Sequence, residues 1–346
     1  MKKNIYLLIA ILLLLTVFLG GCASGMTPSS WYGMTADEKQ AYISGGTNVY
    51  AIDLENQEEA WRFPIKQTVF AAPVLTDDGQ LLVGGYDHVL YSLDPDDASE
   101  NWVFDQARDR WVGSPLVASG TIYAPNADYV LYALNLEGEL LWNYKADQSL
   151  WGTPVTDGRN VYFGSLGGHM YALDAETGDL AWKIETEGAI LGDLVEKDGT
   201  LYASLFSGYL AAFSSRDGDL LWQEPLNSWV WAGPLLDGNN LYVGDGDGNL
   251  YSFNLAGDLL WQETFNGAIV SSPVLVDGEL AVGTDAGKIY FVSLDGEDSR
   301  STSLAGLVYS PPVLAGAYLL VSPTEGEAIV IALEAGDESW SFTPEK

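Results

Sequence analysis

The chain has 346 residues, 47% of them hydrophobic, with 48 acidic against 15 basic side chains and a formal net charge of −33. This length allows one large closed fold or two ordinary domains, and the apolar content excludes a globally disordered chain. The excess of carboxylates excludes nucleic-acid binding, which depends on phosphate neutralisation by Lys and Arg. The acidity is interpreted either as a solubilising coat adapted to salt or as a means of recruiting a basic partner.

Residues 1–21 have the layout of a secretory signal: two lysines, an apolar run and small residues. The apolar run from Ile5 to Leu19 has 15 residues, short against the roughly 20 that a membrane-spanning helix needs. The motif "LGGC" at 19–22 resembles a bacterial lipobox, which implies cleavage before Cys22 and lipidation of its thiol. Residues 22–28 then form a flexible tether. We expect an extracytoplasmic protein, lipid-anchored to the outer membrane or to the outer leaflet of the cytoplasmic membrane.

One phrase recurs along the rest of the chain, most clearly as "YALDAETGDLAW" at 171–182. Its Trp returns at spacings of 41, 40, 40, 40 and 39 residues, and a last gap of 79 contains one unit without the Trp, around "YFVSLDGEDSRS". A proline lies 27 to 29 residues before most of these positions. We count eight units between residues 29 and 346. The recurring tryptophans are Trp61, Trp102, Trp142, Trp182, Trp222, Trp261 and Trp340.

Each unit is predicted to contain four short strands, A to D, separated by Asp-Gly turns. Strand A surrounds the proline, strand B contains segments such as "VYFGS", strand C contains "YALD", and strand D surrounds the Trp. A four-stranded unit cannot bury both of its faces alone, so the Trp is expected to clasp the neighbouring unit. We predict an all-β fold over 29–346, a monomeric eight-bladed β-propeller of four-stranded antiparallel blades. A solenoid is the alternative, but it would need polar capping repeats.

The pattern Ala172-x-Asp174-x-x-Thr177-Gly178-x-x-x-Trp182 resembles the tryptophan-docking motif of pyrroloquinoline quinone (PQQ) repeat propellers. With the lipobox, the chain resembles the BamB family of outer-membrane β-barrel assembly lipoproteins. This resemblance implies protein or peptide partners in the cell envelope. PQQ propellers also include quinone-dependent dehydrogenases, for which the resemblance implies a quinone, a calcium ion, an Asp base and often a disulfide of adjacent cysteines. The single cysteine and the short repeats argue against that activity, so we predict no catalytic residue, no metal and no cofactor.

Other motifs are interpreted as turns. His88 and His169 occupy similar positions between strands B and C. The segment "GDGDGN" at 244–249 lacks the distal Glu of a calcium-binding EF-hand loop, and it aligns with "GSLGGH" at 164–169, which favours a Gly-rich hairpin. No Ser-His-Asp set, P-loop or zinc motif is visible in the sequence.

The strand order assigns the connections to two faces. The D–A segments and B–C turns share one, called the D–A face below, and the A–B and C–D turns share the other. The C–D turns are acidic, as at Asp96, Asp97, Glu176 and Asp179. The D–A stretches are expected to carry several of the few bases. These are Lys66, Arg108, Arg110, Lys145 and Lys183.

Aromatic side chains gather just before strand A, and aromatic residues with Arg are typical of protein-binding surfaces. We therefore predict a non-catalytic, membrane-tethered scaffold that binds protein or peptide on the D–A face. The alternative is a propeller that binds a small molecule or glycan. A groove across several blades would favour the scaffold, and a closed aromatic pocket on the axis would favour the alternative. The predicted partner-binding residues are Phe70, Arg108, Arg110, Trp111, Trp151, Trp229, Trp231 and Tyr309.

Overall fold

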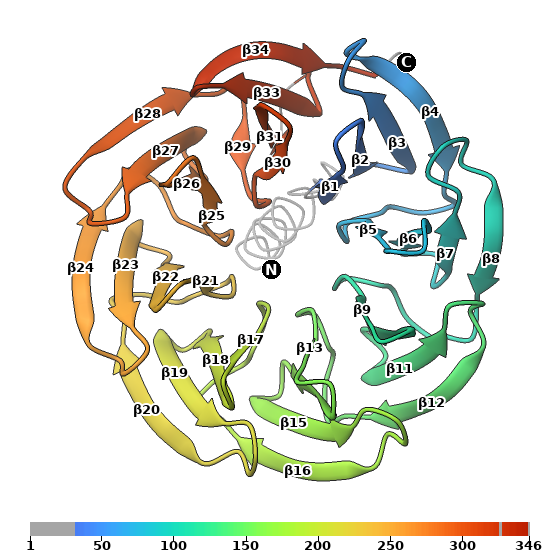
Figure 1. Ribbon diagram of the computed structural model, residues 1–346, viewed down its shortest axis with the longest axis vertical. Helices are drawn as coiled ribbons and strands as arrows, with labels where there is room; N and C mark the ends of the chain where they lie inside the picture. Colours follow the sequence, from blue (N-terminus) through green and yellow to red (C-terminus); the bar gives the residue numbers. More distant parts are fainter. Residues whose placement is uncertain (1–31, 325–326, 345–346) are drawn as a thin grey trace, which may run out of the picture.

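The structure is a computed structural model that describes residues 32–324 and 327–344. Eight antiparallel sheets of four strands surround a central axis (Figure 1), and in each sheet the order along the chain is the order from the axis to the rim. The predicted all-β, eight-bladed propeller is confirmed. The predicted signal peptide, the tether and Cys22 lie outside the described residues. None of the described residues forms a helix long and apolar enough to cross a membrane.

The first four blades follow one another along the chain. Their strands are β1 (Met34–Ala36), β2 (Gln40–Gly45), β3 (Asn48–Asp53) and β4 (Glu58–Pro64); β5 (Val74–Leu75), β6 (Leu81–Gly84), β7 (Leu90–Leu93) and β8 (Glu100–Phe104); β9 (Leu116–Ala118), β10 (Thr121–Pro125), β11 (Val130–Asn135) and β12 (Leu140–Lys145); and β13 (Val155–Thr156), β14 (Asn160–Gly164), β15 (His169–Asp174) and β16 (Leu180–Glu185).

The last four blades repeat this plan, and blade 8 includes an extra short pair, β29 with β32. Their strands are β17 (Val195–Lys197), β18 (Thr200–Leu205), β19 (Tyr209–Ser214) and β20 (Leu220–Pro225); β21 (Leu235–Asp237), β22 (Asn240–Gly244), β23 (Asn249–Asn254) and β24 (Leu259–Thr264); β25 (Val274–Val276), β26 (Glu279–Thr284), β27 (Lys288–Ser293) and β28 (Ser299–Ser303); and β29 (Leu307–Val308), β30 (Val313–Ala315), β31 (Tyr318–Val321), β32 (Pro323–Thr324), β33 (Val330–Glu334) and β34 (Asp337–Phe342).

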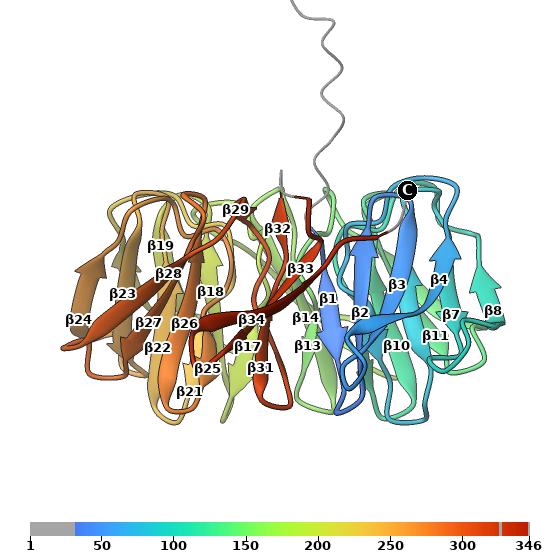
Figure 2. The same ribbon diagram turned by 90° about the horizontal axis from the view of Figure 1, so that it is seen from above.

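The core lies between the blades. Strands B and C are buried along most of their length, so both of their faces pack against neighbouring sheets. Between blades 4 and 5, for example, Tyr162 and Met170 pack with Leu201 and Phe213. Each blade is built from one continuous segment, so side-chain packing closes the ring between blade 8 and blade 1. The edge-on view in Figure 2 shows the ring as one layer of strands between two faces of turns.

The recurring tryptophans join each blade to the next. In blades 1 to 6, the indole N–H donates a hydrogen bond to a backbone carbonyl in the C–D turn of the following blade. The donor–acceptor pairs are Trp61 to Pro95 (2.8 Å), Trp102 to Leu136 (2.8 Å), Trp142 to Ala175 (3.2 Å), Trp182 to Ser215 (3.0 Å), Trp222 to Leu255 (3.0 Å) and Trp261 to Leu294 (2.8 Å).

The turn between strands C and D explains the repeated Asp and Gly. Asp174 accepts hydrogen bonds from the backbone N–H groups of Glu176 (3.1 Å) and Thr177 (2.9 Å). The amide of Thr177 is the main reason why the pKa of Asp174 lies below its usual value. Gly178 has a φ of 74°, and a Cβ there would come within 2.6 Å of the Trp142 indole. The sequence therefore needs Gly both for the backbone conformation and for the close approach of the clasp.

Blade 7 replaces the Trp with Arg300. This residue stands opposite Phe291 in the strand register, where the other blades place their Trp opposite Ala or Ser. Its guanidinium lies 4.0 Å from the centre of the Phe291 ring and donates to the Ala335 carbonyl of blade 8 at 3.5 Å. A planar donor thus takes the place of the indole in the seventh unit. In blade 8, Trp340 is buried in the cluster that joins blades 8 and 1.

Candidate binding site at the mouth of the channel

The D–A segments of all eight blades line a cavity of about 540 Å³ on the axis. The three residues that precede the proline position of strand A form three tiers, counted here toward the strand. The first tier is mostly large and apolar, and the second is small. The lining members of the first tier are Phe70, Val112, Trp151, Leu191, Trp231, Val270 and Tyr309; those of the third are Gly33, Ala72, Ser114, Thr153, Asp193, Gly233, Ser272 and Pro311.

Small residues in the second tier let neighbouring D–A segments touch. A Cβ on Gly113 would lie 2.3 Å from the Trp151 carbonyl oxygen, and one on Gly192 would lie 2.2 Å from the Gly233 nitrogen. Real side chains do not fit at such distances, so the backbones themselves form the wall. This wall fixes the positions of the first- and third-tier side chains around the axis.

Alternation along the extended D–A segment decides which predicted residues reach the cavity. The residue before the first tier is buried in each of blades 2 to 8. These residues are Val69, Trp111, Leu150, Ile190, Val230, Ile269 and Val308. Trp111 is only 1% exposed and packs against Phe104 and Tyr132. Its placement in the partner surface is therefore corrected: Trp111 is a core residue, and Val112 takes the first-tier position.

A continuous aromatic surface runs from the cavity onto the D–A face. The rings of Trp151 and Trp231, from blades 4 and 6, have centroids 6.2 Å apart and flank Leu191 of blade 5. Trp231 lies 6.5 Å from Trp229, which lies 6.0 Å from Phe206. Trp229 and Phe206 are 37% and 40% exposed. Phe206 was missed in the sequence, although it lies in a B–C turn and those turns were assigned to this face.

A second aromatic group lies across the cavity lining in blades 2 and 3. Phe70 and Tyr86 have ring centroids 4.5 Å apart, and the guanidinium of Arg110 lies 5.2 Å from the Tyr86 centroid. Arg108 is exposed but is not part of the cavity lining. The positions of two predicted basic residues were wrong. Lys145 and Lys183 lie in the outer strands β12 and β16 and not in D–A segments.

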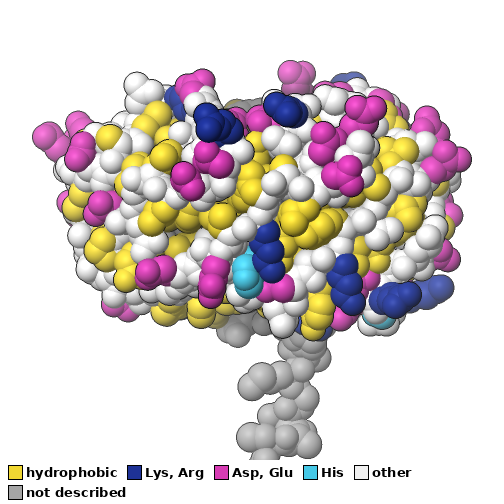
Figure 3. Space-filling view, turned by 90° about the horizontal axis from the view of Figure 1, so that it is seen from below, with side chains coloured by type: hydrophobic (Ala, Val, Ile, Leu, Met, Phe, Trp, Pro, Cys, Tyr) yellow, Lys and Arg dark blue, Asp and Glu magenta, His cyan; other side chains and the backbone are white. Residues whose placement is uncertain are grey.

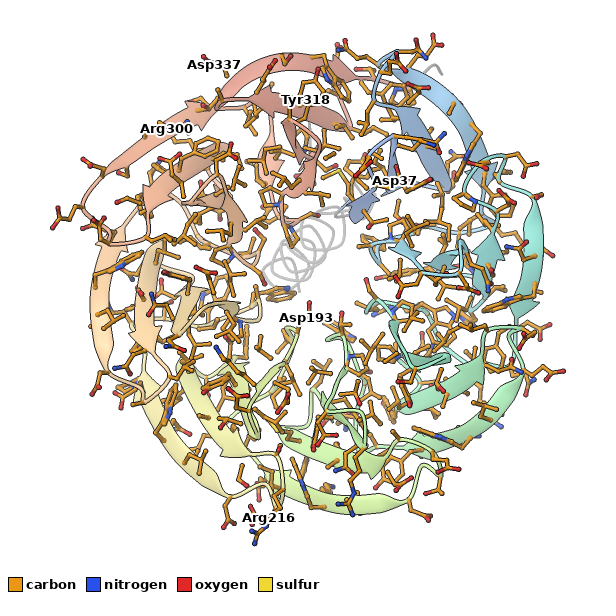
Figure 4. The ribbon with its side chains drawn as sticks, in the orientation of Figure 1. Asp37, Asp193, Arg216, Arg300, Tyr318 and Asp337 are labelled. Carbon is orange, nitrogen blue, oxygen red and sulfur yellow. The ribbon has the colours of Figure 1, made fainter. Side chains whose placement is uncertain are left out.

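Asp193 is a further residue of this site that sequence reasoning missed. Figure 4 places it at the inner edge of the ring, in the third tier. Its Oδ1 accepts a hydrogen bond from the Thr153 backbone N–H at 2.7 Å. The side chain of Asp193 is exposed to the channel, but protein atoms of the ring surround it on the other sides. The resulting desolvation raises the pKa of Asp193, although the hydrogen bonds from Thr153 oppose this effect. In the part of the chain that the structure describes, no basic side chain forms an ion pair with Asp193.

The donor set of the cavity does not fit the calcium–quinone pair of the dehydrogenases that share this repeat. Calcium takes six to eight oxygen ligands, usually including several carboxylates. Among the described lining residues, Asp193 is the one carboxylate and Arg110 the one base. Nor do the described residues contain a group of three or more His, Cys, Asp or Glu side chains placed to hold a metal ion.

The remaining motifs lie in or beside the B–C turns, and His169, interpreted as a turn residue, is the first residue of β15. Asp245 in the "GDGDGN" segment is fully buried and accepts hydrogen bonds from the backbone of Asp247 and from Asn249 and Tyr251, so its oxygens are committed to the hairpin. His88 has a φ of 72°, which fits a turn. Nδ1 of His169 lies 2.6 Å from Oδ2 of Asp147.

The outermost strands carry a second apolar surface that the sequence analysis did not single out. Six leucines of blades 3 to 6 are each about half exposed, and the repeated "LLW" and "LAW" phrases were their visible signal. Figure 3 shows apolar side chains across the rim, among acidic ones. The six are Leu141, Leu180, Leu220, Leu221, Leu259 and Leu260.

The fold and its clasp define the chain as a β-propeller of tryptophan-docked, PQQ-like repeats. A family model described as "Outer membrane protein assembly factor BamB" matches residues 24–149 and 145–342, and the chain belongs to this family. No curated protein sequence matches the chain.

Two solved structures show the same fold. The structure of BamB from Moraxella catarrhalis has 19% sequence identity and a TM-score of 0.74, covering 86% of this chain and 94% of that one. The computationally designed Ika8 protein has 14% identity and a TM-score of 0.75, covering 91% of this chain and 98% of that one. The second likeness is to a designed protein, so this backbone by itself specifies no function.

Proposed function

We propose that this protein is a non-catalytic, lipid-anchored scaffold of the cell envelope that binds a protein or peptide partner on its D–A face. The role would be that of a BamB-like component of outer-membrane protein assembly. The observation that carries the proposal is the aromatic surface that begins with Trp151 in the cavity and ends with the exposed rings of Trp229 and Phe206. Aromatic anchors of this kind dominate binding at protein interfaces.

The attachment of the chain supports the same face. The structure describes the chain from Tyr32, and the next two residues, Gly33 and Met34, line the cavity. Cys22 precedes Tyr32 by ten residues, which limits their separation to about 35 Å. A lipid on Cys22 would thus hold the D–A face toward the membrane. The acidic C–D turns would point away from anionic lipid, which would otherwise repel them.

A pull-down from the native host tests the proposal. Replacing Arg110, Trp151 and Trp231 with Ala should remove the partner while the ring stays folded, because each anchor that fills a partner pocket contributes about 2 kcal/mol or more. The control neutralises four carboxylates of the C–D face, which should alter mainly association rate and salt dependence. These are Asp96, Asp97, Glu176 and Asp179. Loss of the partner in the control alone would assign recognition to the acidic face instead.

The cavity favours one second candidate, a propeller that binds a small molecule or glycan. Its volume of about 540 Å³ lies within the range of small-molecule sites, and aromatic rings line it on the axis. A thermal-shift screen of the purified chain tests this candidate. A ligand that stabilises the native chain, but not the Trp151→Ala variant, would support it.

A further inference from the structure

We propose that the axial cavity is an acceptor for a basic side chain, lysine or arginine, that a partner polypeptide inserts past the Trp151–Trp231 ring pair toward Asp193. This inference rests on the proposed function, because it names the chemistry by which the D–A face would recognise its partner. The charge, the walls and the outward extension of the cavity each support it.

The charge is a single uncompensated carboxylate. Asp193 stands where the other blades place Gly, Ala, Ser, Thr or Pro, and it faces the channel. Its neighbours supply only hydrogen bonds, from Thr153. Confinement within the ring disfavours the ionised form, and an incoming cation would relieve that cost. The carboxylate is therefore an electrostatic partner for a positive group and not a structural ion pair.

The walls next to this carboxylate suit a cation on an apolar stem. Thr153 donates to the Asp193 carboxylate and Gly233 packs against the Asp193 backbone, and these two residues come two positions after Trp151 and Trp231 in the chain. The two indoles therefore line the same side of the cavity as the carboxylate. Indole faces attract an ammonium or guanidinium group. The small side chains of the second tier leave the room between the indoles and the carboxylate that an alkyl stem would fill.

The extension of the site selects a polypeptide over a free amine. The aromatic series continues from Trp231 to Trp229 and Phe206, outside the cavity lining. A small amine in the cavity would leave these exposed rings uncovered, whereas the residues flanking an inserted lysine would cover them. The net charge of −33 attracts a basic segment from a distance, and the cavity then holds one of its side chains.

The test compares two blocked pentapeptides, Leu-Gly-Lys-Gly-Leu and the same peptide with norleucine for lysine, binding to the full-length chain in detergent. Norleucine keeps the alkyl stem and removes only the charge. The lysine peptide should bind at least about tenfold more tightly by calorimetry, and added salt should reduce the difference. Equal binding of the two peptides to the native chain would overturn the inference.

Two variants locate the effect. Asp193→Asn keeps an oxygen for the Thr153 hydrogen bond, and it should abolish the preference for lysine without lowering the unfolding temperature. Asp219→Asn makes the same charge change on the exposed C–D turn of the same blade and should leave the preference intact. Equal losses in both variants would reveal a general field and overturn the site. Butylamine binding that depends on Asp193, with no peptide binding, would also overturn the inference in favour of a free amine.

The peptide assay and the native pull-down can fail separately. A chain that discriminates lysine from norleucine but captures no partner would contradict the proposed function and leave the cation site standing. A chain whose partner depends on Trp231 but not on Asp193 would support the face and refute the basic side chain.

Discussion

Removing one indole from the clasp measures how strongly neighbouring blades hold each other. The variant Trp182→Ala loses the hydrogen bond to the Ser215 carbonyl (3.0 Å) and the packing of the indole on Gly218 and Tyr162. A neutral hydrogen bond contributes about 1 kcal/mol, and truncating a fully buried Trp costs about 3–5 kcal/mol. Because Trp182 is half-buried, we expect the unfolding free energy to fall by about 2–3 kcal/mol.

Urea unfolding followed by far-UV circular dichroism measures this change in unfolding free energy. Two control variants separate the contribution of the hydrogen bond from that of packing. Trp182→Phe keeps an aromatic ring without the N–H and should lose about 1 kcal/mol. Leu180→Ala changes a side chain of the same strand that is 47% exposed, and it should stay within about 0.5 kcal/mol of the native chain. If Trp182→Ala costs no more than Leu180→Ala, the indole does not hold the blades together.

Three further predictions concern the turns and the seventh clasp. Gly178→Ala should destabilise more than Gly158→Ala in thermal unfolding, because both have positive φ but only Gly178 faces an indole across the blade boundary. Arg300→Ala should lower the unfolding free energy by about 1 kcal/mol in urea, whereas Arg216→Ala, at an 89% exposed side chain, should have little effect. The pKa of Asp174 lies below the usual value of 3.8, so the ionised side chain stabilises the fold above pH 3.8 and this stabilisation is lost as the pH falls below it. The melting temperatures of the native chain and of Asp174→Asn should therefore converge between about pH 5 and about pH 2.

The ring could be predicted because the sequence repeats one four-stranded unit eight times. A Trp, a turn Gly and a proline at matching spacings constrain strand number, connection lengths and the contact between units together. The substitution of Arg300 for the seventh Trp could not be predicted from spacing. It depends on the guanidinium reaching the same carbonyl position while packing over Phe291, which requires coordinates.

The site was less predictable, because aromatic content alone does not tell which way a side chain points. Trp111 and Trp231 differ by one position relative to their prolines, four residues before Pro115 and three before Pro234. In an extended segment that one step exchanges core for cavity. Measuring from the proline would have separated them. Asp193 escaped notice for a different reason: its blade lacks the proline, so the register that marks the third tier is missing there.

Comparison among the eight blades separates the residues that hold the ring from those that are free to recognise. The clasp position holds a large planar side chain in every blade, Trp seven times and Arg once. The first-tier position has no such requirement, since Phe, Val, Trp, Leu and Tyr all occur there without altering the blades. Its side chains line the cavity, where Trp151 of blade 4 also contacts Trp231 of blade 6. The fold therefore tolerates non-aromatic residues at this position, and the aromatic concentration in blades 4 and 6 supports the proposed partner surface.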